Sequence, residues 1–261
     1  MNRRRELTAI RPRPDLTRPA RPALPMNKTF SHISLALILS AAAAPAALVT
    51  VTDFQTNGTD TLAHPYAVST TDLLNGIAPT AQPGNFVQEG AGGAGVLTNG
   101  LFASPITRDL GGAFQFSTFA TAGPGGGTSL TYLLGSAQNI GSISVYGGWQ
   151  DSGRDQQSYS IFYSTAAAPG TFLPLTTVDF NPGTTTHPQV TKVSISDTTG
   201  ILASNVAGLR FDFNATENGY SGYSEIDVFA AVPEPGSIGL LGLAVLGAAA
   251  GRRRRQDKPR A

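Results

Sequence analysis

Residues 139–165 read NIGSISVYGGWQDSGRDQQSYSIFYST, and this stretch decides the fold class. In its first part Ile143 and Val145 alternate with serines, and in its last part Tyr159 and Ile161 do the same. Apolar side chains at every second position are typical of a β-strand that buries one face. The glycine, aspartate and serine residues between the two parts favour a loop. The stretch therefore predicts two strands whose apolar side chains face a common core.

The same pattern recurs along the chain between turns rich in Gly, Pro, Asn and Asp. The composition agrees, because 30 glycines, 18 prolines and only 13% charged residues suit short strands and turns better than helices. No stretch within the domain shows a convincing helical period, and no internal repeat is visible. We expect residues 47–231 to form one all-β domain, an antiparallel jelly-roll β-sandwich. The expected strands are 49–54, 112–120, 129–135, 139–149, 157–165, 172–180, 190–196, 206–214 and 223–230.

Charged residues are segregated along the chain. Residues 47–231 hold four basic and thirteen acidic side chains, a net charge of −9, whereas the two ends are basic. An acidic domain argues against a nucleic-acid partner, because that binding depends on Lys and Arg contacts to phosphate. Basic residues beside apolar runs are typical of membrane targeting. The chain has no cysteine, which excludes disulfides, thiolate metal sites and a cysteine nucleophile.

The N-terminal region predicts export. Residues 1–25 are rich in Arg and Pro and cannot form a core, so we interpret them as disordered or as a mis-called start, with Met26 as the true start. The alternative is a genuine long basic region. Residues 26–46 have the positive start, apolar run and small terminal residues of a signal peptide. We expect signal peptidase to cleave after Ala46 or Ala47.

Residues 232–261 combine a proline motif, an apolar run and a basic cluster. The prolines hold their neighbours extended and so end the folded domain. The apolar run predicts a transmembrane helix at about 237–251, which approaches a full membrane span of about 30 Å when counted from residue 232. The arginines keep the end of the chain on the cytoplasmic side. The motif and the cluster consist of Pro233, Glu234, Pro235, Arg252, Arg253, Arg254 and Arg255.

This three-part tail resembles the PEP-CTERM sorting domain. In that family a membrane-embedded peptidase, exosortase, recognises the tail and removes it during export. The resemblance implies exosortase as a partner, transient passage through the inner membrane, and a final location at the cell surface or in the extracellular matrix. The alternative is an ordinary tail anchor, which would not need the Pro-Glu-Pro motif.

Five segments of the domain resemble the discoidin, or coagulation-factor type C, family of galactose-binding-like jelly rolls. In its closing strands an Arg and a Glu recur, and the usual Asp of its DLG turn is here Leu133 or Leu134. The resemblance implies a fold that usually binds rather than cuts and that often holds a structural Ca²⁺ ion. The matching segments are LTNGLF at 97–102, LTYLLGSAQNIGSISVYGGW at 130–149, SYSIFYST at 158–165, VAGLRFDF at 206–213 and GYSEIDVFA at 222–230.

The loop at 147–159 is the most distinctive candidate for a ligand site, because it holds the only tryptophan of the chain, Trp149. An indole ring that stacks on a sugar, with polar groups for the hydroxyls, is a common way to bind carbohydrate. The alternative is that Trp149 caps the sandwich and Arg154 pairs with an acid to order the loop. The candidate ligand-binding residues are Trp149, Asp151, Arg154, Asp155 and Gln156.

Metal and catalytic chemistry have weaker candidates. Loop carboxylates could hold a structural Ca²⁺ ion, and the alternative is a solvated acidic surface. His64 and His187 each precede a proline, so we expect both in extended loops, and no G-x-S-x-G nucleophile motif is present. We expect no catalytic residue and no cofactor other than this ion. The calcium candidates are Asp53, Asp60, Asp72 and Asp109.

The sequence thus predicts an exported, non-enzymatic surface or matrix protein that binds an extracellular polysaccharide. A purely structural surface protein without a ligand is the alternative, and a glycan-active enzyme is a distant third.

Overall fold

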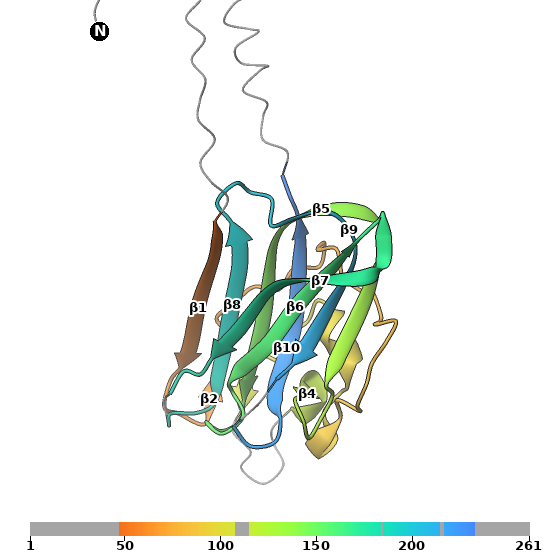
Figure 1. Cartoon of the computed structure of the whole chain (residues 1–261). Helices are drawn as coiled ribbons and strands as arrows, with labels where there is room; N and C mark the ends of the chain where they lie inside the picture. Colours follow the sequence, from red (N-terminus) through yellow and green to blue (C-terminus); the bar gives the residue numbers. More distant parts are fainter. Residues whose placement is uncertain (1–46, 108–114, 184, 215–216, 233–261) are drawn as a thin grey trace, which may run out of the picture. The chain divides into compact units, whose positions relative to one another are not determined.

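The computed structural model describes residues 47–107, 115–183, 185–214 and 217–232, and nearly all of its regular structure is β (Figure 1). The predicted signal peptide at 26–46, the predicted transmembrane helix at 237–251, all seven sorting residues and Asp109 lie outside these residues. The strands are β1 (Leu48–Thr56), β2 (Thr61–Leu62), β3 (Ile106–Thr107), β4 (Ala120–Ala122), β5 (Ser129–Trp149), β6 (Gln157–Thr165), β7 (Ala168–Phe180), β8 (Gln189–Asp197), β9 (Ala203–Phe213) and β10 (Ser221–Ala230). Short 3-10 turns are η1 (Gln88–Gly90), η2 (Ala94–Thr98) and η3 (Phe116–Thr118).

The long strand β5 builds the sandwich, because it belongs to both sheets. Its residues 129–133 pair with β9, and that sheet continues as β5-β9-β6-β7. Its residues 142–149 pair with β8, and β10 pairs on its other side, so the second sheet runs β1-β8-β5-β10-β4. Register shifts between Leu133 and Ile140 mark the change from one sheet to the other. All these pairs are antiparallel, which confirms the expected all-β antiparallel sandwich.

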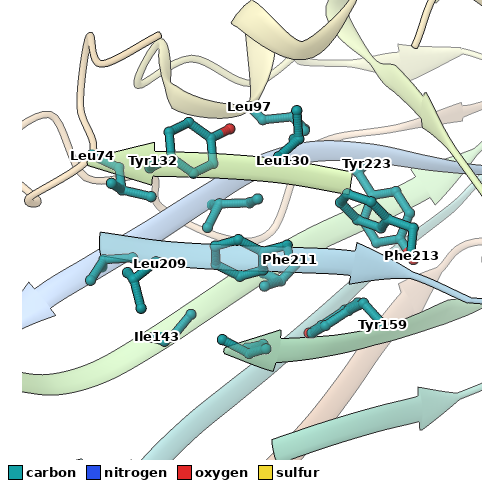
Figure 2. Packing of buried hydrophobic residues seen from close by; sticks show 14 of the residues in the cluster. Leu74, Leu97, Leu130, Tyr132, Ile143, Tyr159, Leu209, Phe211, Phe213 and Tyr223 are labelled. Carbon is teal, nitrogen blue, oxygen red and sulfur yellow. The ribbon is translucent and has the colours of Figure 1, made fainter. Parts of the chain in front are cut away.

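The two sheets enclose one hydrophobic core. Side chains from β6 and β9 meet those of β10, and the rings of Phe213 and Tyr223 lie 5.0 Å apart between centroids (Figure 2). The loop-rich segment between β2 and β4 closes the core with Leu74, Phe86 and Leu97, which are all 0% exposed. The strands and hydrophobic clusters of the described residues all lie within residues 48–230, so the segment 47–232 carries a core.

Most predicted strands agree with the structure. The strand predicted at 112–120 is wrong within residues 115–120, the part that the structure describes. Its residues Phe116–Thr118 form a 3-10 turn rather than a strand. Phe116 and Phe119 are three positions apart, which a 3-10 turn places on one side, and both rings pack near Trp149. The segments 129–135 and 139–149, predicted as separate strands, form the single strand β5. Among the described residues, no helix is long and apolar enough to cross a membrane.

Candidate functional site

Trp149, the expected stacking platform, lies at the end of β5 and is 0% exposed. It belongs to a second hydrophobic cluster, in which its ring lies 5.7 Å from that of Phe119 and 6.1 Å from that of Tyr220 between centroids. A ring without an exposed face cannot stack on a ligand that arrives from solvent. The stacking hypothesis for Trp149 is therefore wrong, and the alternative, in which Trp149 caps the sandwich, agrees with the structure.

Arg154, in the loop between β5 and β6, joins three parts of the chain. Its Nη1 donates to Glu89 Oε1 at 2.7 Å, and its guanidinium carbon lies 4.4 Å from the centre of the Tyr220 ring. The expected alternative, an Arg that pairs with an acid to order its loop, is therefore present. The side chain is 15% exposed, and its Nε–H has no hydrogen-bond partner in the described structure. A guanidinium carries five N–H donors, so Arg154 keeps donors beyond the one that Glu89 accepts.

Asp155 is the most unusual group of this loop. It is 1% exposed, and its carboxyl group lies within hydrogen-bond reach of the Glu217 carboxyl group and of its own backbone N–H. Burial raises the pKa of Asp155 well above its ordinary value, and the neighbouring carboxyl of Glu217 raises it further. A proton, a hydrogen-bond donor or a cation would stabilise a buried carboxyl group of this kind.

The two remaining predicted residues of this end, Asp151 and Gln156, each have a hydrogen-bond partner nearby. Asp151 accepts a bond from the Gly153 N–H at 3.0 Å, and Gln156 Nε2 donates to Asp179 Oδ1 at 2.7 Å. The structure thus keeps four of the five predicted residues in one polar region and adds two acids from distant loops. We call this set the loop cluster; it consists of Glu89, Asp151, Arg154, Asp155, Gln156 and Glu217.

A second polar site, absent from the expected ligand-binding residues, lies on β10. Ile226 and Val228 face the core, so the alternating Glu225 and Asp227 face the opposite side, where the segment 69–101 covers them. Glu225 is 0% exposed, Asp227 is 1% exposed and Asp72 of the covering loop is 9% exposed. We call these three residues the carboxylate cluster.

The hydrogen bonds of the carboxylate cluster are incomplete. Asp72 Oδ1 accepts bonds from the N–H groups of Leu74 at 2.8 Å and Val228 at 3.2 Å, and Asp227 Oδ2 accepts from the Tyr146 hydroxyl at 3.3 Å. Oδ2 of Asp72 and Oδ1 of Asp227 have no partner in the described structure, whereas the backbone N–H groups of Gly100 and Leu101 bond to the carboxyl group of Glu225. A proton or a cation would stabilise buried carboxyl oxygens of this kind.

The electrostatics of the carboxylate cluster follow from burial and like charge. Burial raises the pKa of Glu225 to about 9, with Asp227 and Asp72 as further causes. Burial also raises the pKa of Asp227 to about 6. Without a cation, Glu225 is therefore protonated at neutral pH. The alternation of acids with apolar residues in SEIDV, residues 224–228, does identify a strand with one buried face. The same alternation, taken alone, indicates that the acids on the other face are solvated, so it does not reveal that they are buried.

The four calcium candidates have different surroundings. Asp53 lies on the exposed strand β1, Asp60 lies in an exposed loop, and Asp72 belongs to the carboxylate cluster. Within the described ranges, no group of three or more His, Cys, Asp or Glu side chains is arranged to hold a metal ion together. Calcium also accepts backbone carbonyls and needs hard oxygen ligands. The buried carboxyl oxygens of Glu225 and Asp72 are hard ligands of that kind.

The two histidines have structural surroundings. His64 stacks on Phe102 at 3.9 Å between centroids, and burial lowers its pKa to about 4. His187 is held by a contact of 3.0 Å between its Nδ1 and the carbonyl oxygen of Thr185. Neither contact pairs a histidine with a hydroxyl nucleophile.

The tail has a family match and the domain has distant structural neighbours. Residues 231–255 match the PEP-CTERM protein-sorting motif, which confirms the resemblance of the tail. This motif marks the chain as an exported protein that exosortase sorts. No curated protein matches the sequence.

Among solved structures, the chain is similar to the F5/8 type C domain of a Bacteroides fragilis protein, with 16% identity, 40% of this chain and 66% of that chain covered, and a TM-score of 0.29. The match thus spans just under two thirds of that domain. It is similar to the family 32 carbohydrate-binding module of Clostridium perfringens NanJ, with 16% identity, coverages of 57% and 90%, and a TM-score of 0.33. It is also similar to a chitosan-binding module from a Paenibacillus chitosanase/glucanase, with 13% identity, coverages of 61% and 98%, and a TM-score of 0.38.

Proposed function

We propose that the sandwich domain of this exported protein binds an extracellular polysaccharide without chemical change to it, and that exosortase releases the domain to the cell surface or matrix. The observation that carries the proposal is the sorting motif at residues 231–255, which follows the last strand of the domain directly.

The loop cluster supplies the chemistry for such a ligand. Sugar hydroxyls both donate and accept hydrogen bonds, so a site needs carboxylates and amides together with strong donors. Arg154, which is 15% exposed, offers N–H donors beyond the one that Glu89 accepts, and the exposed carboxylates of Glu89 and Glu217 offer acceptors. With Trp149 buried, the proposed site lacks an aromatic platform there and depends on polar contacts, which favours weak, multivalent binding to a polymer.

The test uses the purified domain, residues 47–232, on an array of bacterial and plant polysaccharides. We expect binding by the wild type and loss of binding by Arg154→Ala, with the melting temperature within a few degrees of the wild type. Arg210→Ala is the matched control, because Arg210 is also an Arg with an acidic partner but lies on the outer sheet face. A wild type that binds no polysaccharide refutes the proposal and favours a purely structural surface protein.

We further propose that the carboxylate cluster holds one Ca²⁺ ion, with Glu225 and Asp72 as side-chain ligands. The ion would neutralise buried acids and tie the segment 69–101 to β10, so its role would be structural. The observation that supports this site is the burial of the neighbouring carboxyl groups of Glu225 and Asp72, which lie close enough for Asp72 to raise the pKa of Glu225. Calcium should raise the melting temperature of the wild type and leave that of Glu225→Gln unchanged.

A further inference from the structure

Strand β1 is an edge strand with unusual exposure. In the described structure it pairs only with β8, over nine residues without a register shift. Its apolar side chains are open to solvent: Leu48 is 45% exposed, Val49 37%, Val51 58% and Phe54 37%. Figure 1 shows β1 at the end of its sheet, with β8 on one side. A long, regular and apolar edge of this kind invites another strand.

The pairing with β8 determines which backbone groups are free. The Thr198 N–H donates to the Ala47 carbonyl at 3.0 Å, and the pairing continues in the same register. Hydrogen-bonded and non-bonded pairs alternate in an antiparallel ladder. The backbone N–H and C=O groups of Val49, Val51 and Asp53 therefore point to β8. The backbone N–H and C=O groups of the even-numbered residues 48–54 point to the free edge.

The far edge of the other sheet is protected, in contrast to β1. The outermost strand there, β7, contains Pro169 and Pro174, which lack an N–H, and its pairing with β6 shifts register twice. Prolines and bulges are the usual means by which proteins block edge pairing. Strand β1 has no proline, no bulge and only one charged residue, Asp53.

We propose that β1 pairs with β1 of a second copy of this chain, antiparallel, about a two-fold axis at Val51. In this register Thr50 faces Thr52 of the other copy and Leu48 faces Phe54. These four residues carry the free N–H and C=O groups, so the ladder would gain about eight hydrogen bonds, two for each facing pair. The two sheets would then form one continuous sheet across the dimer.

The charges permit this contact. Although the domain is acidic, Asp53 would face Val49 of the other copy, so no like charges oppose each other across the axis. On its own sheet, Asp53 is paired in register with Lys192 of β8, which balances it locally. A two-fold contact uses the same edge twice and therefore closes at the dimer, whereas pairing of β1 with the blocked β7 edge would build open filaments.

Cysteine cross-linking tests the register directly, because the chain has no cysteine of its own. The two Val51 residues would form a non-hydrogen-bonded pair with Cα atoms about 4.5 Å apart, which a disulfide can bridge. We expect oxidised Val51→Cys to become a covalent dimer. Leu173→Cys, at a 44% exposed position on β7, is the matched control and should form no covalent dimer.

A charge variant tests the dimer without cross-linking. Val51→Lys places two lysines at the axis and should weaken dimerisation by about tenfold or more in sedimentation or light scattering. Because Val51 is 58% exposed, the melting temperature of the isolated monomer should not change. Leu173→Lys should leave the dimer intact. A wild type that stays monomeric at ~0.1 mM, a dimer without Val51→Cys cross-links, or higher oligomers would each overturn the proposal.

Discussion

Glu225→Gln is the sharpest test of the carboxylate cluster. The pKa of Glu225 is raised to about 9 from an ordinary value of 4.5, and its side chain is 0% exposed. Between these values the folded protein holds a proton that the unfolded chain has lost. The free energy of unfolding must therefore fall as pH rises through this window, by up to about 1.4 kcal/mol for each pH unit.

The magnitude follows from that slope. Between pH 5.5 and pH 7.5, in the absence of a cation, the titration of Glu225 alone should lower the free energy of unfolding of the wild type by up to about 2.7 kcal/mol. The amide that Glu225→Gln introduces has nearly the same shape as the carboxyl group and no charge, so the variant lacks this term. Glu225→Gln should equal the wild type in stability near pH 5 and exceed it by about 1–3 kcal/mol at pH 7.5.

The assay is urea unfolding of residues 47–232 at pH 5.5, 6.5 and 7.5, first with a chelator and then with Ca²⁺. Asp60→Asn, which removes a carboxylate from an exposed loop, is the control and should keep the wild-type slope. Calcium should reverse the order at pH 7.5, because only the wild type can bind it through Glu225. Equal slopes for the wild type and Glu225→Gln in the chelator would refute the reasoning.

Three further predictions concern the core, a tight glycine contact and the tail. Trp149→Ala should cost about 3–5 kcal/mol in urea unfolding, because it empties a fully buried position, whereas Trp149→Phe should cost much less. A Cβ on Gly127 would lie 1.8 Å from a carbon of the buried Phe86 ring, so Gly127→Ala should lower stability by about 1–3 kcal/mol, while Gly170→Ala, with nothing within 4 Å, should not. Intact-mass analysis of protein from the cell surface should show a start near Ala47 and loss of Arg252, Arg253, Arg254 and Arg255, and recovery of an intact C-terminus would contradict processing by exosortase.

Much of the fold could be predicted because alternation reports one buried face. Ile143, Val145, Tyr159 and Ile161 were expected to face the core, and all four are 0% exposed. The segment 112–120 could not be predicted in this way, because its phenylalanines also fit a period of three. When a short segment fits both a period of two and a period of three, the residues that pack on it determine its conformation. Here the rings of Phe116 and Phe119 pack near Trp149.

The candidate site was harder to predict, because alternation identifies one face of a strand and leaves open what covers the other. Trp149 and Glu225 are both buried by segments without a period: η3 and Tyr220 pack on Trp149, and residues 69–101 cover Glu225. These covering segments lie far from Trp149 and Glu225 in the sequence and have no apolar period that would reveal their positions. From the sequence alone, Trp149 beside polar neighbours was therefore expected to be exposed, and Glu225 on a strand was expected to be solvated. The covering segments thus decide the chemistry of both places. They remove the only tryptophan from the candidate ligand surface and turn a strand acid into a buried carboxyl that a proton or a cation must neutralise.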